Sequence, residues 1–208
     1  SYINHCLHAA EALNASYSES IYQITLYYYD RSGQLVKTIP PKGVDLLSDA
    51  EVNQVQSHRN GTYAAVYPTH TQATTYKYNA GNQCIQKASP DEGTVRYCYD
   101  QFGRLVMSQS ASQGDENACT YLKYDIHGRN IETGRMPYSG NIPSAIIYSS
   151  FTSTLASASK TEITETVYDQ IPSEATGEFS SATAIMRNRT SAIHYSESEG
   201  VKDYSTYF

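Results

Sequence analysis

A ten-residue pattern that recurs along this 208-residue chain constrains the fold more than any other feature of the sequence. Its clearest copy is residues 97–106, YCYDQFGRLV. Tyr97 and Tyr99 lie on the same side of a strand, because side chains alternate between the two faces of a sheet. Asp100 and Gly103 are placed for a type I turn, in which the carboxylate accepts backbone N–H groups and glycine adopts a positive φ. The pattern therefore predicts a β-hairpin whose short loop ends in a glycine bulge.

Further copies of the pattern lie on both sides of this one. They span residues 27–36, 76–85 and 122–131, and a degraded copy begins at Val167 and breaks at Pro172. In one copy Asn79 replaces the aspartate and Asn82 the glycine, and asparagine suits both places in such a turn. The tyrosines before the turn acid or amide are residues 29, 78, 99, 124 and 168, so the spacings are 49, 21, 25 and 44 residues. The long spacings are about twice the short ones, which indicates a tandem-repeat architecture.

The repeat resembles the YD repeat of the RHS family, which reads approximately Tyr-Asp-x-x-Gly-Arg-Leu. Residues 100–105 and 125–129 match that motif, whereas Gln34, Asn82 and Gln83 depart from it. The resemblance implies an all-β fold in which tandem antiparallel β-hairpins form a continuous curved or spiralling sheet, as part of a YD-repeat shell. Short turns between successive strands favour the same antiparallel order and a twisted sheet.

We expect three regions along the chain. They are an N-terminal edge segment at 1–20, YD-repeat hairpins at 21–136 with an insertion at about 43–60, and divergent repeats at 137–208, truncated at the C-terminus. The last residues, 204–208, resemble the start of another hairpin. The chain is therefore expected to be a piece of a longer polypeptide.

Three segments between the hairpins carry signals of their own. Ser48 and Glu51 form a capping-box pattern that predicts one short helical insertion at about 49–57, either a plain insertion or an element that binds a partner. Residues 62–67 alternate weakly as a strand, and 111–118 are rich in loop-forming residues. Residues 136–159 contain no charged side chain, and we expect extended β structure packed on the sheet, with a flexible surface segment as the alternative.

The composition narrows the possible partners. The chain holds 20 tyrosines and no tryptophan, and tyrosine suits a sheet with one half-wet face because it joins an apolar ring to a hydroxyl. The formal charge of −6 and the lack of a basic block argue against nucleic acid or an anionic membrane as the main partner. No apolar run approaches the roughly 18 residues that a membrane span needs, so membrane insertion is not expected.

The cysteines and histidines do not follow the spacing of a metal site. Cys84 and Cys98 lie in neighbouring hairpins, where they either form a disulfide or remain small buried thiols. His5, Cys6 and His8 are close in sequence but lack further ligands at a second position, and a short helix or frayed terminus is the alternative. We therefore expect no metal and no cofactor.

The sequence carries no catalytic motif, neither a nucleophile elbow nor a zinc-protease signature nor a phosphate-binding loop. Repeated aspartates, Asp30, Asp100 and Asp125, suggest acid–base chemistry or calcium, but their offset from the turn glycine explains them as turn formers. His127 occupies a variable loop position. Larger family members carry an autoproteolytic core segment after the repeats, and no stretch here matches it. We expect no enzyme and no catalytic, cofactor-binding or metal residues.

Two functions follow from the resemblance and from the tyrosines. Related family members wind their repeats into a hollow shell around a C-terminal toxin or effector, which implies a wall segment whose partners are the rest of its own chain and that cargo. The alternative is a carbohydrate- or cell-surface-binding module that uses rows of tyrosine, or adhesion as in the related teneurins. In a eukaryotic host Asn14, Asn60 and Asn188 would be glycosylation acceptors. The resemblance implies a secreted or cell-surface bacterial protein.

Overall fold

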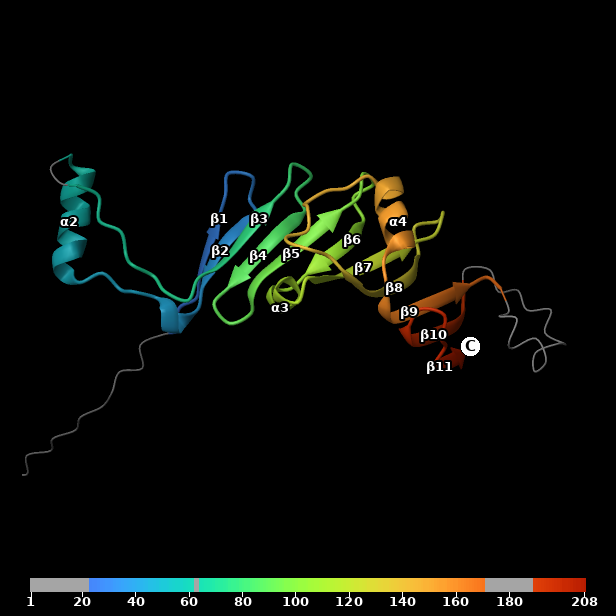
Figure 1. Cartoon of the computed structure of the whole chain (residues 1–208). Helices are drawn as coiled ribbons and strands as arrows, with labels where there is room; N and C mark the ends of the chain where they lie inside the picture. The colour runs from blue at the N-terminus through green and yellow to red at the C-terminus, as the bar shows by residue number, and fades with distance from the viewer. Residues whose placement is uncertain (1–22, 62–63, 171–188) are drawn as a thin grey trace, which may run out of the picture.

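A single antiparallel sheet dominates the computed structural model, which describes residues 23–61, 64–170 and 189–208 (Figure 1). Its eleven strands follow one another in sequence order, each hydrogen-bonded to the next. They are β1 (Leu26–Tyr29), β2 (Leu35–Ile39), β3 (Thr74–Tyr78), β4 (Cys84–Ser89), β5 (Gly93–Tyr99), β6 (Leu105–Gln109), β7 (Ala118–Tyr124), β8 (Asn130–Pro137), β9 (Thr161–Tyr168), β10 (Thr190–Ser198) and β11 (Tyr204–Tyr207). The predicted all-β fold of tandem hairpins in one continuous sheet is confirmed.

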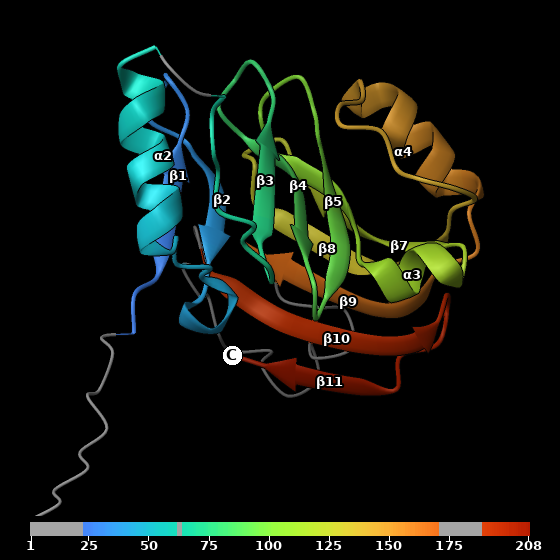
Figure 2. The ribbon, with the colours of Figure 1, turned by 90° about the vertical axis from the view of Figure 1, so that its left-hand side faces the viewer.

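The sheet is strongly twisted and does not close on itself. Viewed from the end, β1 to β5 stand upright while β9 to β11 run across them (Figure 2). β1 and β11 are the two edge strands. Such a twist is the normal outcome of right-handed strands accumulating across a large sheet.

The register between neighbouring strands shows which side chains lie on the same face of the sheet. Cys98, Met107 and Tyr121 are direct cross-strand partners and share one side, which we call the packed face. Tyr27, Tyr76 and Tyr97 point to the opposite side, which we call the tyrosine face, because they alternate with those positions in the ladder.

The hydrophobic core lies on the packed face of the central strands. Its buried members from the sheet include Cys98, Met107, Cys119, Tyr121 and Met136. They are covered by the chain that follows β8, which contributes Ile142, Phe151 and Leu155. In the described ranges the sheet thus forms one layer, and a second layer covers its middle.

Helix α2 (Asp49–Arg59) confirms the predicted helical insertion. Ser48 accepts a hydrogen bond from the Glu51 backbone while the Glu51 carboxylate binds the Ser48 backbone, so the capping box is complete. No residue of α2 is buried, and the helix stands apart from the sheet in Figure 1. A short 3-10 helix, η1 (Pro41–Gly43), ends the first hairpin where the prolines cannot continue the ladder.

Two further helices were not expected from the sequence. Helix α3 (Ala111–Asp115) replaces the expected loop and has its own capping box from Ser110 and Gln113. Helix α4 (Tyr148–Ser157) corrects the prediction of extended structure at 136–159, because Phe151 and Leu155, four residues apart, enter the core together. None of the helices in the described residues has the length and apolar composition to cross a membrane.

Three further predictions concern the insertion and the two ends of the chain. Residues 64–67 form no strand, so that prediction was wrong for the described part of the segment 62–67. Residues 204–208 contain β11, which pairs with β10, and the expectation that another hairpin begins there stays a prediction. The expected edge segment 1–20 lies outside the described residues.

Candidate functional site

The hairpin turns of the four clear repeats share one hydrogen-bonded geometry. In each, the carboxylate or amide oxygen of the first residue accepts two backbone N–H groups; for Asp100 these belong to Phe102 (2.9 Å) and Arg104 (2.8 Å). Gly103 adopts a φ of +79°, and Asn82 takes the same left-handed conformation with a φ of +63°. The structure thus places Asp30, Asn79, Asp100 and Asp125 as turn formers.

Arginine follows the turn glycine in two repeats and binds the turn carboxylate a second time. The Arg104 Nε donates to Asp100 Oδ2 at 2.8 Å, and Asp100 has no exposed side-chain surface. Arg129 Nε makes the same bond to Asp125 at 2.7 Å. Desolvation raises the pKa of Asp125, but hydrogen bonds from Arg129 and His127 outweigh it and lower that pKa overall. Asp125 is therefore held ionised as a structural acceptor.

In the second, third and fourth repeats, the tyrosine before the turn connects its hairpin to the preceding one. The hydroxyl of Tyr78 donates to the Leu35 carbonyl (2.8 Å), and that of Tyr124 to the Leu105 carbonyl (2.7 Å). Tyr99 makes the equivalent bond to Cys84 at 3.0 Å. Each acceptor is the first residue of the second strand of its hairpin. It pairs with the tyrosine that precedes the turn of that same hairpin, at the position where the register shifts. Burial raises the pKa of all three phenols, so they remain donors at neutral pH.

The last residue of each turn reaches toward the following hairpin. Gln34 Nε2 donates to Asn82 Oδ1 (2.6 Å), and Gln83 Nε2 donates to the Gly103 carbonyl (2.7 Å). The Arg104 guanidinium lies 4.8 Å from the Tyr124 ring centre and 4.6 Å from that of Tyr148 in α4. Repeats are thus linked in both directions along one edge of the sheet, which we call the turn edge.

The degraded repeat at Val167 is a genuine fifth hairpin. The Asp169 N–H donates to the Arg189 carbonyl at 3.2 Å, the bond that joins the ends of the turn in the other repeats. Arg129 from the fourth repeat lies 4.4 Å from the Tyr168 ring centre and pairs with Asp169 at 2.7 Å. An insertion between residues 169 and 189 therefore interrupts the motif without removing the pairing of β9 with β10.

A buried polar cluster lies on the packed face beyond the core. Glu132 accepts hydrogen bonds from the Tyr121 hydroxyl (2.7 Å), Lys123 (2.9 Å) and Lys160 (3.2 Å). Desolvation raises the pKa of Glu132, but these donors outweigh it and lower that pKa overall. A carboxylate held in this way is a poor proton acceptor at neutral pH. Sequence reasoning missed this cluster because it depends on register across β7, β8 and the start of β9.

The described cysteines are free thiols, so the Cys84–Cys98 disulfide is not formed. Cys98 and Cys119 are buried, in agreement with the alternative of small buried residues, whereas Cys84 is half-buried. Burial raises the pKa of Cys98 and of Cys119 to about 12. Both thiols are therefore protonated and unreactive at neutral pH.

No group of three or more metal-ligating side chains is arranged for a metal ion in the described residues. His5, Cys6 and His8 lie outside that part of the chain. His127 is exposed at the tip of its turn, and its backbone N–H donates to Asp125.

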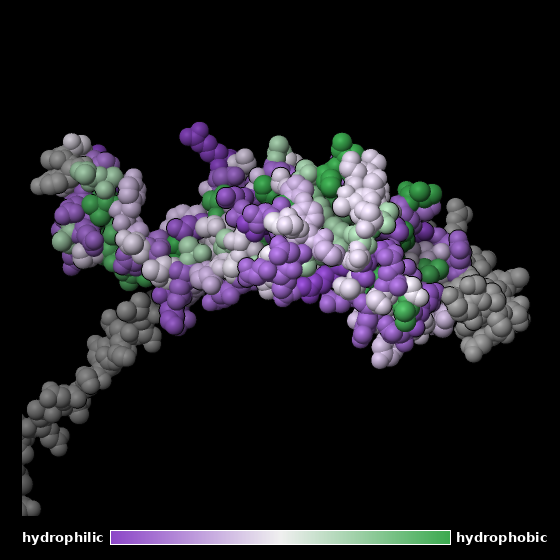
Figure 3. All heavy atoms as spheres, viewed as in Figure 1, coloured by the Kyte–Doolittle hydropathy of each residue, from purple (hydrophilic) through white to green (hydrophobic). Residues whose placement is uncertain are grey.

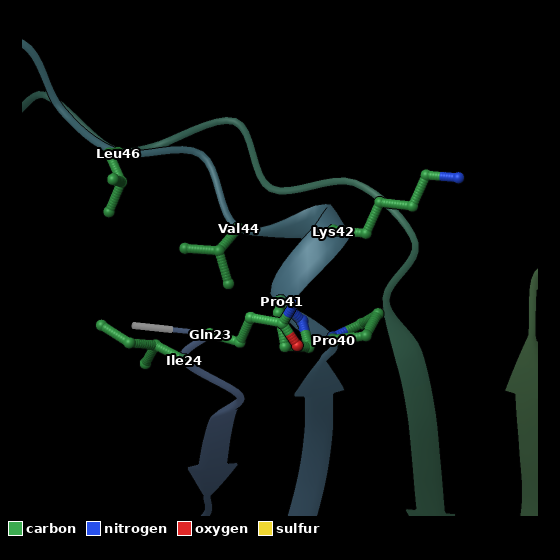
Figure 4. A pocket seen from close by; sticks show the side chains of 7 residues that line it. All are labelled: Gln23, Ile24, Pro40, Pro41, Lys42, Val44 and Leu46. Carbon is green, nitrogen blue, oxygen red and sulfur yellow. The ribbon is translucent and has the colours of Figure 1, made fainter. Parts of the chain in front are cut away.

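Three hollows lie beside the first strands, and one of them, of about 630 Å³, is lined in part by Asp30, Gln34 and Tyr78. Another cavity, of about 730 Å³, on the tyrosine face is lined in part by Tyr27, Thr38 and Tyr76. The third cavity, of about 530 Å³, lies where the chain enters β1 and leaves η1 (Figure 4). Its lining is mostly apolar and consists of Gln23, Ile24, Pro40, Pro41, Lys42, Val44 and Leu46.

Comparison with known proteins gives matches only among solved structures. No protein-family model matches the chain, and no curated protein does. The Photorhabdus luminescens Tc holotoxin pore matches with 14% identity and a TM-score of 0.43, covering 82% of this chain and 6% of that one. The TcdB2-TccC3 crystal structure matches with 14% identity and a TM-score of 0.44, covering 85% and 7%. The chain therefore spans only a small part of these toxin-complex chains, and the likeness does not establish its family.

Proposed function

We propose that this chain is a non-enzymatic wall segment of a YD-repeat shell that encloses a C-terminal toxin or effector. The supporting observation is the turn edge, where each tyrosine hydroxyl binds the returning strand of the preceding hairpin. Hairpins linked in this way add to one growing sheet. A large twisted sheet must curl or close to protect its edges, and an enclosing wall is one such outcome.

The first strand supports continuation of the sheet beyond the described residues. Tyr29 is 62% exposed, and within the described part of the chain its hydroxyl has no carbonyl partner like those of the later repeats. A preceding hairpin would supply that carbonyl. We therefore assign the rest of a longer polypeptide as the first partner of this segment and an enclosed toxin or effector as the second.

The absence of enzymatic activity and the location are part of the same proposal. Among the buried ionisable groups of the described residues, Asp100 is bound in its turn, Glu132 is bound in its cluster, and His194 Nδ1 lies 2.8 Å from the Ser205 hydroxyl. The two buried thiols are protonated. A wall for a toxin implies a secreted or cell-surface bacterial protein that requires no cofactor.

Electron microscopy of the complete polypeptide that carries this chain tests the shell. We expect a hollow particle whose wall contains these hairpins. Removal of the segment that follows the repeats should increase binding of a hydrophobic dye such as anilinonaphthalene sulfonate, because lumen surface becomes exposed. A particle without an internal cavity, or dye binding unchanged by the removal, contradicts the proposal.

A carbohydrate-binding module is the second candidate, favoured by the tyrosine face. Tyr27 is 58% exposed and lines the 730 Å³ cavity with Tyr76, while Tyr97 lies further along the same face. Aromatic rings presented in a row suit stacking against sugars. On a glycan array, specific binding that is lost in Tyr27→Ala and Tyr97→Ala would favour this function over the wall.

A further inference from the structure

Three cations on the packed face of the first five strands have no acidic partner among the residues that the structure describes. Register places Lys37 of β2 opposite Thr75, and Lys77 of β3 opposite Gln86, which in turn lies opposite Arg96 of β5. Because Thr75 and Lys77 are two residues apart, all three cations project to the same side. We call Lys37, Lys77 and Arg96 the basic patch.

Six cations of the turns and later strands are paired with carboxylates, namely Lys87, Arg104, Lys123, Arg129, Arg135 and Lys160. The exposed Arg31, Lys42, Arg59 and Arg189 have no ion pair in the described part of the chain, but the basic patch differs from them because its three cations share one face of neighbouring strands. Within the described residues, the side chains of the basic patch make neither an ion pair nor a hydrogen bond, and Lys37 only lies 5.7 Å from the Tyr28 ring centre. The positions on the packed face of β1 to β6 include no aspartate or glutamate.

The surroundings of the basic patch are polar and partly open. Lys77 is exposed, while Lys37 and Arg96 are half-buried. The residues between them are small or uncharged, namely Thr75, Gln86, Ala88 and Thr94. The apolar layer of Ile142, Phe151 and Leu155 packs instead on the core to which β5 to β8 contribute. A positive surface therefore remains on one part of a chain whose formal charge is −6.

We infer that the basic patch binds an acidic peptide segment. Strands lie about 4.8 Å apart, so β2 and β5 are separated by about 14 Å, the length of four or five extended residues. Acidic side chains at alternate positions of an extended segment recur about every 7 Å and would meet cations at this spacing. A nucleic acid fits less well, because its phosphate chain would continue from this small patch onto a protein of net negative charge.

This inference goes beyond the proposed shell, because it requires only the face of the first hairpins and no closed particle. The probe is a fluorescent peptide of about ten residues with alternating glutamate and threonine, measured by anisotropy with the 208-residue chain. We expect saturable binding that weakens as salt rises from about 50 to 300 mM, since salt screens exposed charges. A matched peptide with glutamine in place of glutamate should not bind.

A charge-matched pair of variants identifies the surface. In the test variant Lys37, Lys77 and Arg96 are all replaced by glutamine; in the control Arg31, Lys42 and Arg59, which are exposed elsewhere, are replaced by glutamine. Both variants lose three positive charges. We expect on the order of tenfold weaker binding for the test variant, from the loss of three charge pairs at the surface, and little change for the control.

Several outcomes would overturn the inference. They are equal weakening in both variants, equal binding of the glutamine peptide, or tighter binding of single-stranded DNA or of phosphatidylserine vesicles than of the acidic peptide. Circular dichroism of both variants must match the parent, and if the triple substitution unfolds the chain, the single variant Lys77→Gln takes its place, because Lys77 is exposed. In that case an unchanged affinity rejects the inference.

Discussion

Replacing Asp100 with alanine should destabilise the chain far more than the same change at Asp30, although both residues begin the same kind of turn. Asp100 Oδ1 accepts two backbone N–H groups, and its Oδ2 accepts both Nε (2.8 Å) and Nη2 (2.7 Å) of Arg104. Asp30 accepts the two backbone groups, but Gln34 stands in the arginine position and is directed to Asn82 instead. The two sites therefore differ by one buried ion pair.

The expected loss of stability in Asp100→Ala follows from the burial of the Asp100 side chain. The Asp100 side chain has no exposed surface, whereas Arg104 retains 23%. Breaking a buried pair costs about 3–5 kcal/mol, and Arg104 can partly recover hydration, so we expect about 3 kcal/mol for Asp100→Ala. For a chain of this size that corresponds to a melting temperature about 6–12 °C lower. Asp30 is exposed, so Asp30→Ala should cause a much smaller decrease.

Urea unfolding followed by far-ultraviolet circular dichroism measures both variants. Asp100→Ala leaves the Arg104 guanidinium without its partner, and the double variant of Asp100→Ala with Arg104→Ala removes that guanidinium. The double variant therefore separates the contribution of the ion pair to stability from that of the two backbone hydrogen bonds. The double variant should lose less stability than the sum of the two single variants. If Asp100→Ala and Asp30→Ala cost the same, the ion pair contributes nothing and the reasoning fails.

Three further predictions concern the packed face and the turn edge. Glu132→Gln should lower the free energy of unfolding near neutral pH. Because folding lowers the pKa of Glu132, the stabilisation by its carboxylate is fully present above the ordinary pKa of 4.5 and is lost as the pH falls through the pKa of the folded state. Urea unfolding curves of the variant and the parent should therefore converge in acid. Tyr124→Phe removes the hydroxyl bond between hairpins and should lower the free energy of unfolding by about 1 kcal/mol. Tyr29→Phe should change the unfolding midpoint little, and equal effects of the two substitutions would contradict the role of the bond. Gly134→Ala would place a Cβ 2.8 Å from the Tyr121 hydroxyl and 3.0 Å from the Thr161 carbonyl oxygen, and should lower the melting temperature. Gly114→Ala, whose Cβ would have its nearest neighbour at 4.0 Å, should be neutral or stabilising.

The turns could be predicted from the sequence because their chemistry is local. An acid or amide at the first position and a glycine or asparagine three residues later specify both the hydrogen bonds and the left-handed residue, as at Asp100 and Gly103. Ser48 and Glu51 specified α2 in the same way. Where every signal lies within a few residues, the prediction of structure succeeded.

Prediction failed where tertiary packing decides the outcome. Residues 148–157 are rich in serine and threonine, which have weak helix propensity, yet α4 forms because its two buried apolar side chains enter the core. The capping box at Ser110 and Gln113 could have been found, but the surrounding residues favoured a loop. The insertion before Arg189 concealed the fifth hairpin, since the ends of its turn are far apart in sequence.

The turn edge also has a direction, which no single repeat reveals. Tyrosine binds backward to the preceding hairpin, as Tyr124 does to Leu105, whereas the arginine or glutamine after the turn reaches forward, as Arg104 does to Tyr124. An internal hairpin is therefore linked twice to each neighbour, and a first hairpin lacks its backward bond. The exposed Tyr29 is in that position. A sheet built by this rule gains stability at each added repeat and is weakest at its edges, so β1 should exchange its amide hydrogens faster than the equivalent strand β5.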